Sequence, residues 1–274
     1  MVQMILFQIV KIMINELLLL SGNDIPIEEI NLLLHPPTIK EIAYIGEDKF
    51  FSGCEFLRFT KDKLNSEDRN RLENISNFEI IMSIMREKNP SVQINKTCAQ
   101  MVLSLLFPTY QIQIDIENLK IIFTQEKDNL TFELNKDNYD KFIEALNEIL
   151  CLGGGSSDYK PSGSLARQIA DKLRDRQAKL AAAKGMDNQK IAILSRYVSI
   201  LAVGENKDMN SLLNYTTYQL FDEFKRYQLK IAWGIHIKAQ LAGAKDLQEV
   251  DDWMEDIHSN VDENGVLKNS NNKW

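Results

Sequence analysis

The chain has 274 residues, of which 44% are hydrophobic and 26% are charged. This is a globular composition, long enough for one large domain or two of ordinary size, and it argues against a disulfide scaffold, a collagen or a fully disordered chain. With 32 Lys and Arg residues against 39 Asp and Glu residues, the net charge is -7. That balance argues against a protein that coats nucleic acid.

The cysteines and the N-terminus bear on the compartment of the protein. Cys54, Cys98 and Cys151 are widely spaced, without a CxxC pair or a neighbouring histidine that would complete a zinc site. We interpret them as buried thiols in a reducing cytosol. The apolar first residues lack a positively charged start and are interrupted by polar side chains, so we predict neither a signal peptide nor a membrane span. We expect the first domain to begin at Met13, with residues 1–12 either the product of an upstream start or a short extra element.

Helix signals follow one another in the first hundred residues. Thr38 and Glu41 form a capping-box pattern, which predicts a helix that starts at Ile39 and stops before Gly46. Further helices are predicted over the aromatic-rich residues 48–59, from Ser66, after a cap at Asn77, and over the apolar residues 98–107. We expect the last of these to be the central helix of the domain.

From residue 110 the hydrophobic period changes to two. Residues 110–116, 119–124 and 130–134 alternate between apolar and polar side chains, which predicts a small antiparallel sheet with a hairpin turn at residues 128–129. A helix capped by residues 137–138 follows and ends near residue 150. The sequence therefore predicts an α+β N-terminal domain over residues 13–152.

A composition change marks the next boundary. Residues 153–164 begin with three glycines and continue with Ser, Pro and Gly, which predicts a flexible linker; they lack the lysine pattern of a phosphate-binding loop. A basic helix over 165–184, a helix over 191–203 and one long helix over 209–242 are predicted after it. We therefore predict a helical C-terminal domain over residues 165–258 and a disordered tail over 259–274.

The usual catalytic and metal-binding constellations are not recognisable in the sequence. His35, His236 and His258 form no HExxH pair, and no GxSxG pattern occurs. We interpret the acidic residues 251–256 as a solvated face around Trp253. These observations predict a protein that is not an enzyme and that has no catalytic residue, no cofactor and no bound metal.

The long predicted helix carries more apolar surface than two short neighbours can bury, which indicates a protein partner or self-association. The candidate partner-binding residues are Leu220, Phe224, Tyr227, Ile231, Trp233 and Trp253. The basic helix over 165–184 could contact phosphates, but no aromatic residues interleave to stack on bases, so we favour a protein partner or a solvated face there. We expect neither a membrane nor a nucleic acid to be the main partner.

Several strings together carry a family resemblance. They lie at residues 35–51, 194–201, 215–222 and 241–243, the last ahead of Trp253 and Met254, with Ala244 where a second glycine is expected. Over residues 13–258 the chain resembles tail-module proteins of tailed bacteriophages and prophages, which are similar to tail assembly chaperones and baseplate hub assembly proteins. The resemblance implies a virion morphogenesis protein that binds tape-measure, tube or baseplate proteins in the bacterial host cytoplasm, or that resides in the virion tail. A nucleic-acid-associated phage protein that uses residues 165–184 is the alternative, and an enzyme with an unrecognised site is the third hypothesis.

Overall fold

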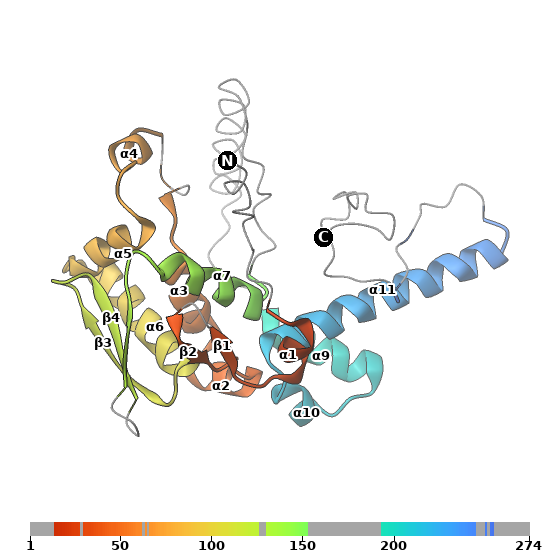
Figure 1. The fold of residues 1–274 in the computed structure, drawn as a ribbon. Coiled ribbons are helices and arrows are strands. Elements are labelled where there is room, and N and C mark those ends of the chain that lie inside the picture. Colours follow the sequence, from red (N-terminus) through yellow and green to blue (C-terminus); the bar gives the residue numbers. More distant parts are fainter. Residues whose placement is uncertain are drawn as a thin grey trace, which may run out of the picture.

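The computed structural model describes residues 14–27, 30–61, 64, 66–125, 130–152, 193–244, 250 and 253–254. The N-terminal part combines helices with small antiparallel sheets, and the C-terminal part is helical with one long helix (Figure 1), which confirms the predicted fold class. The predicted linker over 153–164, the basic helix over 165–184, the hairpin turn at 128–129 and the tail over 259–274 lie outside the described residues.

The chain first forms a short helix and two short strands that the sequence analysis did not predict. Helix α1 (Glu16–Ser21) ends at Gly22, whose φ of 68° lies in the left-handed region that glycine adopts most easily. Strands β1 (Ile25–Ile27) and β2 (Leu32–Leu34) pair antiparallel, and each buries its two outer residues. Three-residue strands are too short for a two-residue period to be recognised in the sequence.

Five helices follow: α2 (Ile39–Ile45), α3 (Glu47–Leu57), α4 (Ser66–Arg71), α5 (Asn77–Arg86) and α6 (Pro90–Leu106). Thr38 and Glu41 form the predicted capping box at α2. The predicted cap of α5 is wrong, because Ser76 is the N-cap and forms a capping box with Glu79. Asn77 is instead the first helical residue, and its Oδ1 accepts a hydrogen bond from the Lys61 amide at 3.0 Å.

Helix α6 crosses the middle of the N-terminal part, in agreement with its predicted central position. It begins earlier than the apolar run suggests, because Asn89 caps it and Pro90 occupies its first turn. Its apolar face is fully buried at Val102, Leu103 and Leu106.

The three predicted strands form one antiparallel sheet. Strands β3 (Tyr110–Asp115), β4 (Lys120–Gln125) and β5 (Thr131–Leu134) lie in that order. Phe123 on β4 pairs with Phe132 on β5, and its ring packs edge-on against Phe107 after α6 at a centroid distance of 4.8 Å. Helix α7 (Tyr139–Ile149) then closes the N-terminal part, and its Tyr139 hydroxyl donates to the Leu57 carbonyl at 2.7 Å.

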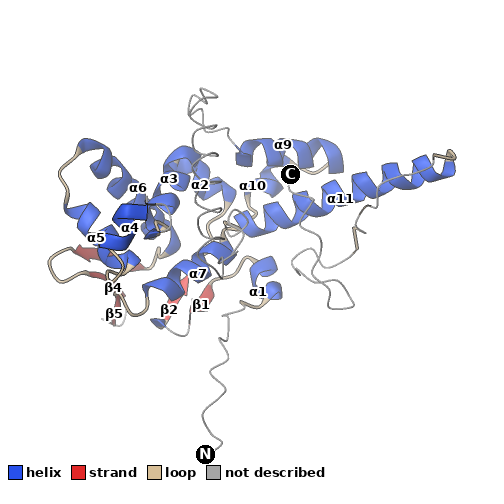
Figure 2. Ribbon diagram, turned by 90° about the horizontal axis from the view of Figure 1, so that it is seen from above, coloured by secondary structure: helices blue, strands red, loops and turns tan. Residues whose placement is uncertain are grey.

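Among the described residues, the C-terminal part contains α9 (Ile193–Glu205), α10 (Met209–Leu213) and α11 (Thr217–Leu241), as Figure 2 shows from above. The prediction of one helix over residues 209–242 is wrong, because the chain turns between α10 and α11. Thr216 accepts a hydrogen bond from the Gln219 amide and starts α11 with its own capping box. With 25 residues, α11 is about 38 Å long.

The two parts share one hydrophobic core. A single cluster of buried side chains contains Phe50 and Ile149 from the N-terminal part together with Leu201, Leu212 and Leu220 from α9, α10 and α11. The Thr217 hydroxyl at the start of α11 also donates to the Ile149 carbonyl at 3.3 Å. The base of the long helix is therefore part of the N-terminal core rather than a separate layer.

The three cysteines are free thiols. Cys54 and Cys98 are buried, as predicted, whereas Cys151 is partly exposed. Burial raises the pKa of Cys54 to about 12, against which the nearby Arg58 acts only weakly. Burial likewise raises the pKa of Cys151 to about 12, so both thiols are protonated at neutral pH.

Candidate partner-binding surface

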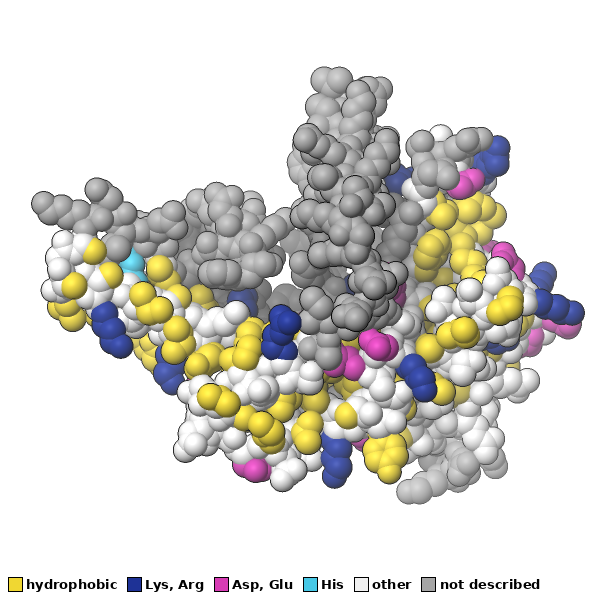
Figure 3. All heavy atoms as spheres, turned by 180° about the vertical axis from the view of Figure 1, so that it is seen from behind, with side chains coloured by type: hydrophobic (Ala, Val, Ile, Leu, Met, Phe, Trp, Pro, Cys, Tyr) yellow, Lys and Arg dark blue, Asp and Glu magenta, His cyan; other side chains and the backbone are white. Residues whose placement is uncertain are grey.

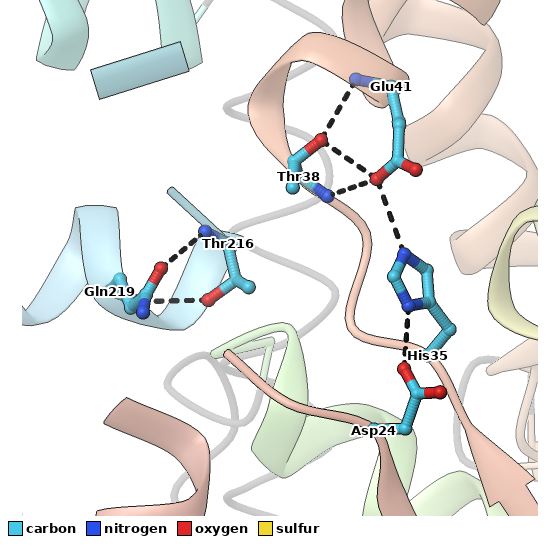
Figure 4. A network of polar contacts seen from close by, with 6 residues as sticks. All are labelled: Asp24, His35, Thr38, Glu41, Thr216 and Gln219. Carbon is cyan, nitrogen blue, oxygen red and sulfur yellow. Dashed lines mark hydrogen bonds and ion pairs between the residues drawn. The ribbon is translucent and has the colours of Figure 1, made fainter. Parts of the chain in front are cut away.

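The base of α11 is held by two capping boxes that meet (Figure 4). Glu41 accepts from the Thr38 amide at 2.8 Å in the first box, and Gln219 accepts from the Thr216 amide at 2.8 Å in the second. The two threonines face each other in an isolated antiparallel β-bridge. These contacts fix the start of α11 against the start of α2.

His35 braces this junction. Its Nδ1 lies 2.7 Å from Asp24 Oδ1, and its Nε2 lies 3.4 Å from Glu41 Oε2. Burial raises the pKa of Glu41. Hydrogen bonds from Thr38 and the proximity of His35 lower it by more, so the net pKa is below its usual value. His35 thus joins the loop after α1 to the cap of α2.

Helix α9 lies along the first half of α11. The ring of Tyr197 stacks on Phe224, with centroids 3.9 Å apart and planes at 15°, and it meets Phe221 edge-on. Glu47 on α3 accepts hydrogen bonds from the backbone amides of Ile193 and Leu194 at 2.6 and 3.0 Å. The first turn of α9 is thereby capped by a residue from the N-terminal part.

The contact between α9 and α11 ends at Glu205. Gly204 lies against Tyr227 so closely that a Cβ there would be 2.2 Å from the Tyr227 hydroxyl. Lys230 Nζ lies 3.5 Å from Glu205 Oε1, one turn further along α11. Beyond this point α11 continues away from the other labelled elements in both ribbon views (Figures 1 and 2). We call residues 228–241 the α11 arm.

Large apolar side chains are exposed along the α11 arm. The exposed fractions are 46% for Ile231, 63% for Ile235 and 83% for Leu241. A Cβ added to Gly234 would meet no atom within 4 Å, so the helix backbone is open to close approach there. The arm is therefore a helical surface with apolar side chains in solvent.

The structure divides the six residues predicted to bind a partner. Leu220 is 0% and Phe224 9% exposed, so both belong to the core of the chain and neither is available to a partner in this conformation. Tyr227 is half-buried at the end of α9, and Ile231 is exposed on the arm. Trp233 is half-buried and stacks on His236 with centroids 6.3 Å apart.

Trp253, the sixth, lines the same hollow as Tyr227. It is 36% exposed and lines a hollow of about 490 Å³ beside α1, α9 and α11, together with Leu20, Arg226 and Lys230. Two exposed residues of the arm, Ile235 and Leu241, were missed as partner-binding candidates. Their signal was the continuation of apolar spacing after Ile231.

Basic residues accompany the apolar ones. Residues 225–241 contain Lys225, Arg226, Lys230 and Lys238 and no Asp or Glu. Figure 3 shows hydrophobic and basic side chains together on the end of the molecule that α11 forms. The first part of this charge is balanced within the chain, since Arg226 Nε lies 3.5 Å from Asp222 and Lys230 pairs with Glu205.

Lys207 also lines the hollow that contains Trp253. Its Nζ pairs with Glu223, lies 3.2 Å from the Tyr215 hydroxyl and sits 5.5 Å from the centre of that ring. Burial lowers the pKa of Lys207, but its contacts with Glu223 and Tyr215 raise it by more, so the net pKa is above its usual value. This cluster holds the loop after α9 against α11.

A second apolar surface lies between α2 and α6. A groove of about 890 Å³ is lined by Tyr44, Ile45, Met101 and Leu105, with polar side chains at its edges. Tyr44 is 91% exposed at the rim. Tyr44 was not predicted as a site residue, since one aromatic residue on the outer face of a short helix is an ordinary surface feature.

The described ranges also bear on metal binding and on membrane insertion. In these ranges no cluster of three or more His, Cys, Asp or Glu side chains is arranged to hold a metal ion. No helix within them combines the length and the low polarity that crossing a bilayer requires. His258 and the four acidic residues of the segment 251–256 lie outside these ranges.

The C-terminal helices are similar to a known domain. Residues 184–258, which contain α9, α10 and α11, match the family described as the YomV second domain, a phage- or prophage-type protein family. No curated protein and no solved structure matches the chain significantly. The match agrees with the predicted phage origin, and it covers the part of the chain that bears the α11 arm.

Proposed function

We propose that the protein is a non-enzymatic morphogenesis protein of a phage tail or baseplate, which binds tail proteins as an assembly chaperone or as a structural component. The observation that carries the proposal is the α11 arm, a braced helix with Ile231, Ile235 and Leu241 exposed. The phage-type family match over the same helices supports it.

The architecture suits such a role. A protein that keeps an aggregation-prone partner in solution needs apolar surface that its own core does not cover. The base of α11 is fixed by the Thr38 and Thr216 caps and by α9, so the arm is held in one direction. Basic residues beside the apolar stripe keep the arm hydrated when it is unoccupied.

Co-expression with the tail proteins encoded beside its gene tests the proposal. We expect affinity purification of the full chain to retain a tape-measure, tube or baseplate protein. The double variant Ile231→Ser/Ile235→Ser should lose that protein, whereas Ile94→Ser, at a 64% exposed position on α6, should keep it. If no tail protein is retained, or if retention is the same in all three chains, the proposal fails.

A second measurement separates the two forms of the proposal. Mass spectrometry of purified phage particles should detect the chain if it is a structural component and should miss it if it acts only during assembly. The alternative nucleic-acid role depends on residues 165–184, which lie outside the described residues.

A further inference from the structure

We infer that a hollow between the end of α5, the start of α6 and the turn after β3 binds a small organic phosphate with two or more negative charges. We call it the basic hollow; its volume is about 590 Å³. Helix α5 and the three-stranded sheet lie at the opposite end of the molecule from the α11 arm in both ribbon views (Figures 1 and 2). The inference therefore goes beyond the proposed function.

Hydrogen bonds hold the walls of the basic hollow together. Arg86 Nη2 donates to the Ile116 carbonyl at 3.3 Å, which joins the end of α5 to the turn after β3. Gln93 Nε2 donates to the Glu87 carbonyl at 2.6 Å, which joins the start of α6 to the residues after α5. The three elements are thus already in place for a ligand.

Cationic side chains outnumber acidic ones in the basic hollow. Arg86, Lys88 and Lys96 line it, against the single carboxylate of Glu117. Within the described part of the chain neither lysine has an ion pair or a hydrogen bond, and Arg86 bonds only to a neutral carbonyl. Like charges that share one hollow repel one another, and an anion bound between them removes that repulsion.

Helix stabilisation does not account for this group of cations. Arg86 occupies the last turn of α5, where a cation interacts favourably with the helix dipole. Lys88 follows the end of α5, and Lys96 lies in the second turn of α6. The part of the chain that contains them, residues 1–152, is acidic, with 23 Asp and Glu residues against 15 Lys and Arg residues. The positive charge is therefore local to the hollow.

The size and the floor of the basic hollow indicate the class of anion. Its volume falls within the range of about 300–1,000 Å³ that is typical of small-molecule sites. Met85, which is 1% exposed, and the partly buried Ile116 supply apolar surface. An arginine and two lysines suit phosphate oxygens. A ligand with phosphate groups at the cations and an organic body on the apolar floor satisfies both kinds of surface.

Isothermal titration calorimetry of the full chain with inorganic phosphate, inorganic diphosphate and ADP tests this inference. We expect diphosphate to bind at least roughly tenfold more tightly than phosphate, because it carries more charge. ADP should bind more tightly than diphosphate, since its organic body can contact the apolar floor. Added salt should weaken all three, because the cations are near the surface.

Variants assign the binding to the basic hollow. Lys88→Gln and Lys96→Gln should each weaken diphosphate roughly threefold, and the double variant roughly tenfold, since pairs of accessible charges contribute modestly. Lys49→Gln, at an exposed position of α3, and Ile235→Ser on the α11 arm are controls that should leave the affinity unchanged. Circular dichroism melting of each variant checks that it is folded.

Several results would overturn the inference. An unchanged affinity in the double lysine variant would place the anion elsewhere on the chain. A single-stranded oligonucleotide that binds through the same lysines more tightly than ADP would identify a nucleic acid as the ligand, and lysine-dependent retention on phosphatidylglycerol vesicles would identify a lipid surface. Equally tight binding of a Glu-rich peptide would remove the preference for phosphate.

The inference and the proposed function fail separately. An absence of measurable diphosphate and ADP binding would contradict the role of the basic hollow and leave the role of the α11 arm intact. Lysine-dependent ADP binding without retention of any tail protein would support the basic hollow and contradict the role in tail assembly.

Discussion

Single residues at helix starts fix the geometry of the α11 arm. Thr216 is 2% exposed, its hydroxyl accepts from the Gln219 amide, and it bridges to Thr38. Gln219 in turn donates from Nε2 to the Leu20 carbonyl at 2.7 Å. The two residues of this capping box, Thr216 and Gln219, thus connect α11 to α2 and to α1.

Thr216→Ala should destabilise the protein by about 1 kcal/mol, up to about 2 kcal/mol, because the Gln219 amide loses its acceptor in a buried place. Urea unfolding followed by circular dichroism measures the change. Thr97→Ala is the control: the Thr97 hydroxyl bonds to the Gln93 carbonyl inside an exposed helix turn, where alanine is the better helix former. A loss at Thr97 as large as at Thr216 would contradict the importance of the cap.

The cap of α2 should make stability depend on pH. The pKa of Glu41 is lowered from 4.5 in the folded chain, so its ionised form stabilises the fold at neutral pH. This contribution is lost as the pH falls through the lowered folded pKa, below the unfolded value. Glu41→Gln should therefore be less stable than the wild type at neutral pH, and the difference should shrink below pH 4.5. Urea midpoints of both chains across this range give the test, and a difference that grows on acidification would contradict it.

At the scale of elements, two glycines in helices have opposite surroundings. Gly53 in α3 faces α6, where an added Cβ would lie 2.4 Å from the Cys98 carbonyl oxygen and 2.7 Å from a Val102 methyl. Gly234 in α11 has open space around it. The first allows two central helices to touch, whereas the second is unconstrained within the described structure.

Alanine at these positions should shift stability in opposite directions. Gly53→Ala should cost about 1–3 kcal/mol, because the Cys98 backbone cannot move aside and the overlap exceeds the gain in helix propensity. Gly234→Ala should stabilise by up to about 1 kcal/mol, since only the propensity changes. Chemical unfolding of the two variants provides the comparison, and a stable Gly53→Ala chain would show that α3 and α6 are less tightly packed than described.

At the scale of the whole molecule, the helical part and the α+β part stabilise each other. Leu220 of α11 is 0% exposed in the cluster that also contains Ile149 of α7. Arg58 also stabilises the end of the N-terminal part through two hydrogen bonds. It donates one to the Asn147 side chain and the other to the Leu152 carbonyl at 2.6 Å. A substitution that disrupts the packing of the α11 base should therefore also destabilise α7.

Leu220→Ala should cost about 2–5 kcal/mol, whereas Ile235→Ala on the exposed arm should change stability by less than about 0.5 kcal/mol. Hydrogen exchange measured by mass spectrometry should show reduced protection in both α7 and the first turns of α11 for Leu220→Ala. If only α11 loses protection, the two parts are independent units despite their shared core.

Local patterns were sufficient for most of the elements. The capping box at Thr38, the two-residue period of β3, β4 and β5, and the apolar face of α6 each depend on residues within a few positions of one another, which is why they could be predicted. The cap of α5 was misplaced by one residue because Ser76 and Asn77 are both good capping residues. The turn before α11 was not predicted, because the apolar spacing continues through it. Thr216 and Gln219 do form a capping-box pattern, which marks the start of α11.

The sequence by itself determined the α+β and helical composition, the phage-type resemblance and the surplus of apolar residues in the long helix. Only the tertiary structure decided which of those residues are surplus. Leu220, Phe224 and Ile231 belong to the same helical pattern of apolar residues. The core covers Leu220 and Phe224, whereas α9 ends before it reaches Ile231. Helical periodicity reports the face of a helix on which a side chain lies, whereas burial depends on how far the neighbouring elements extend along it.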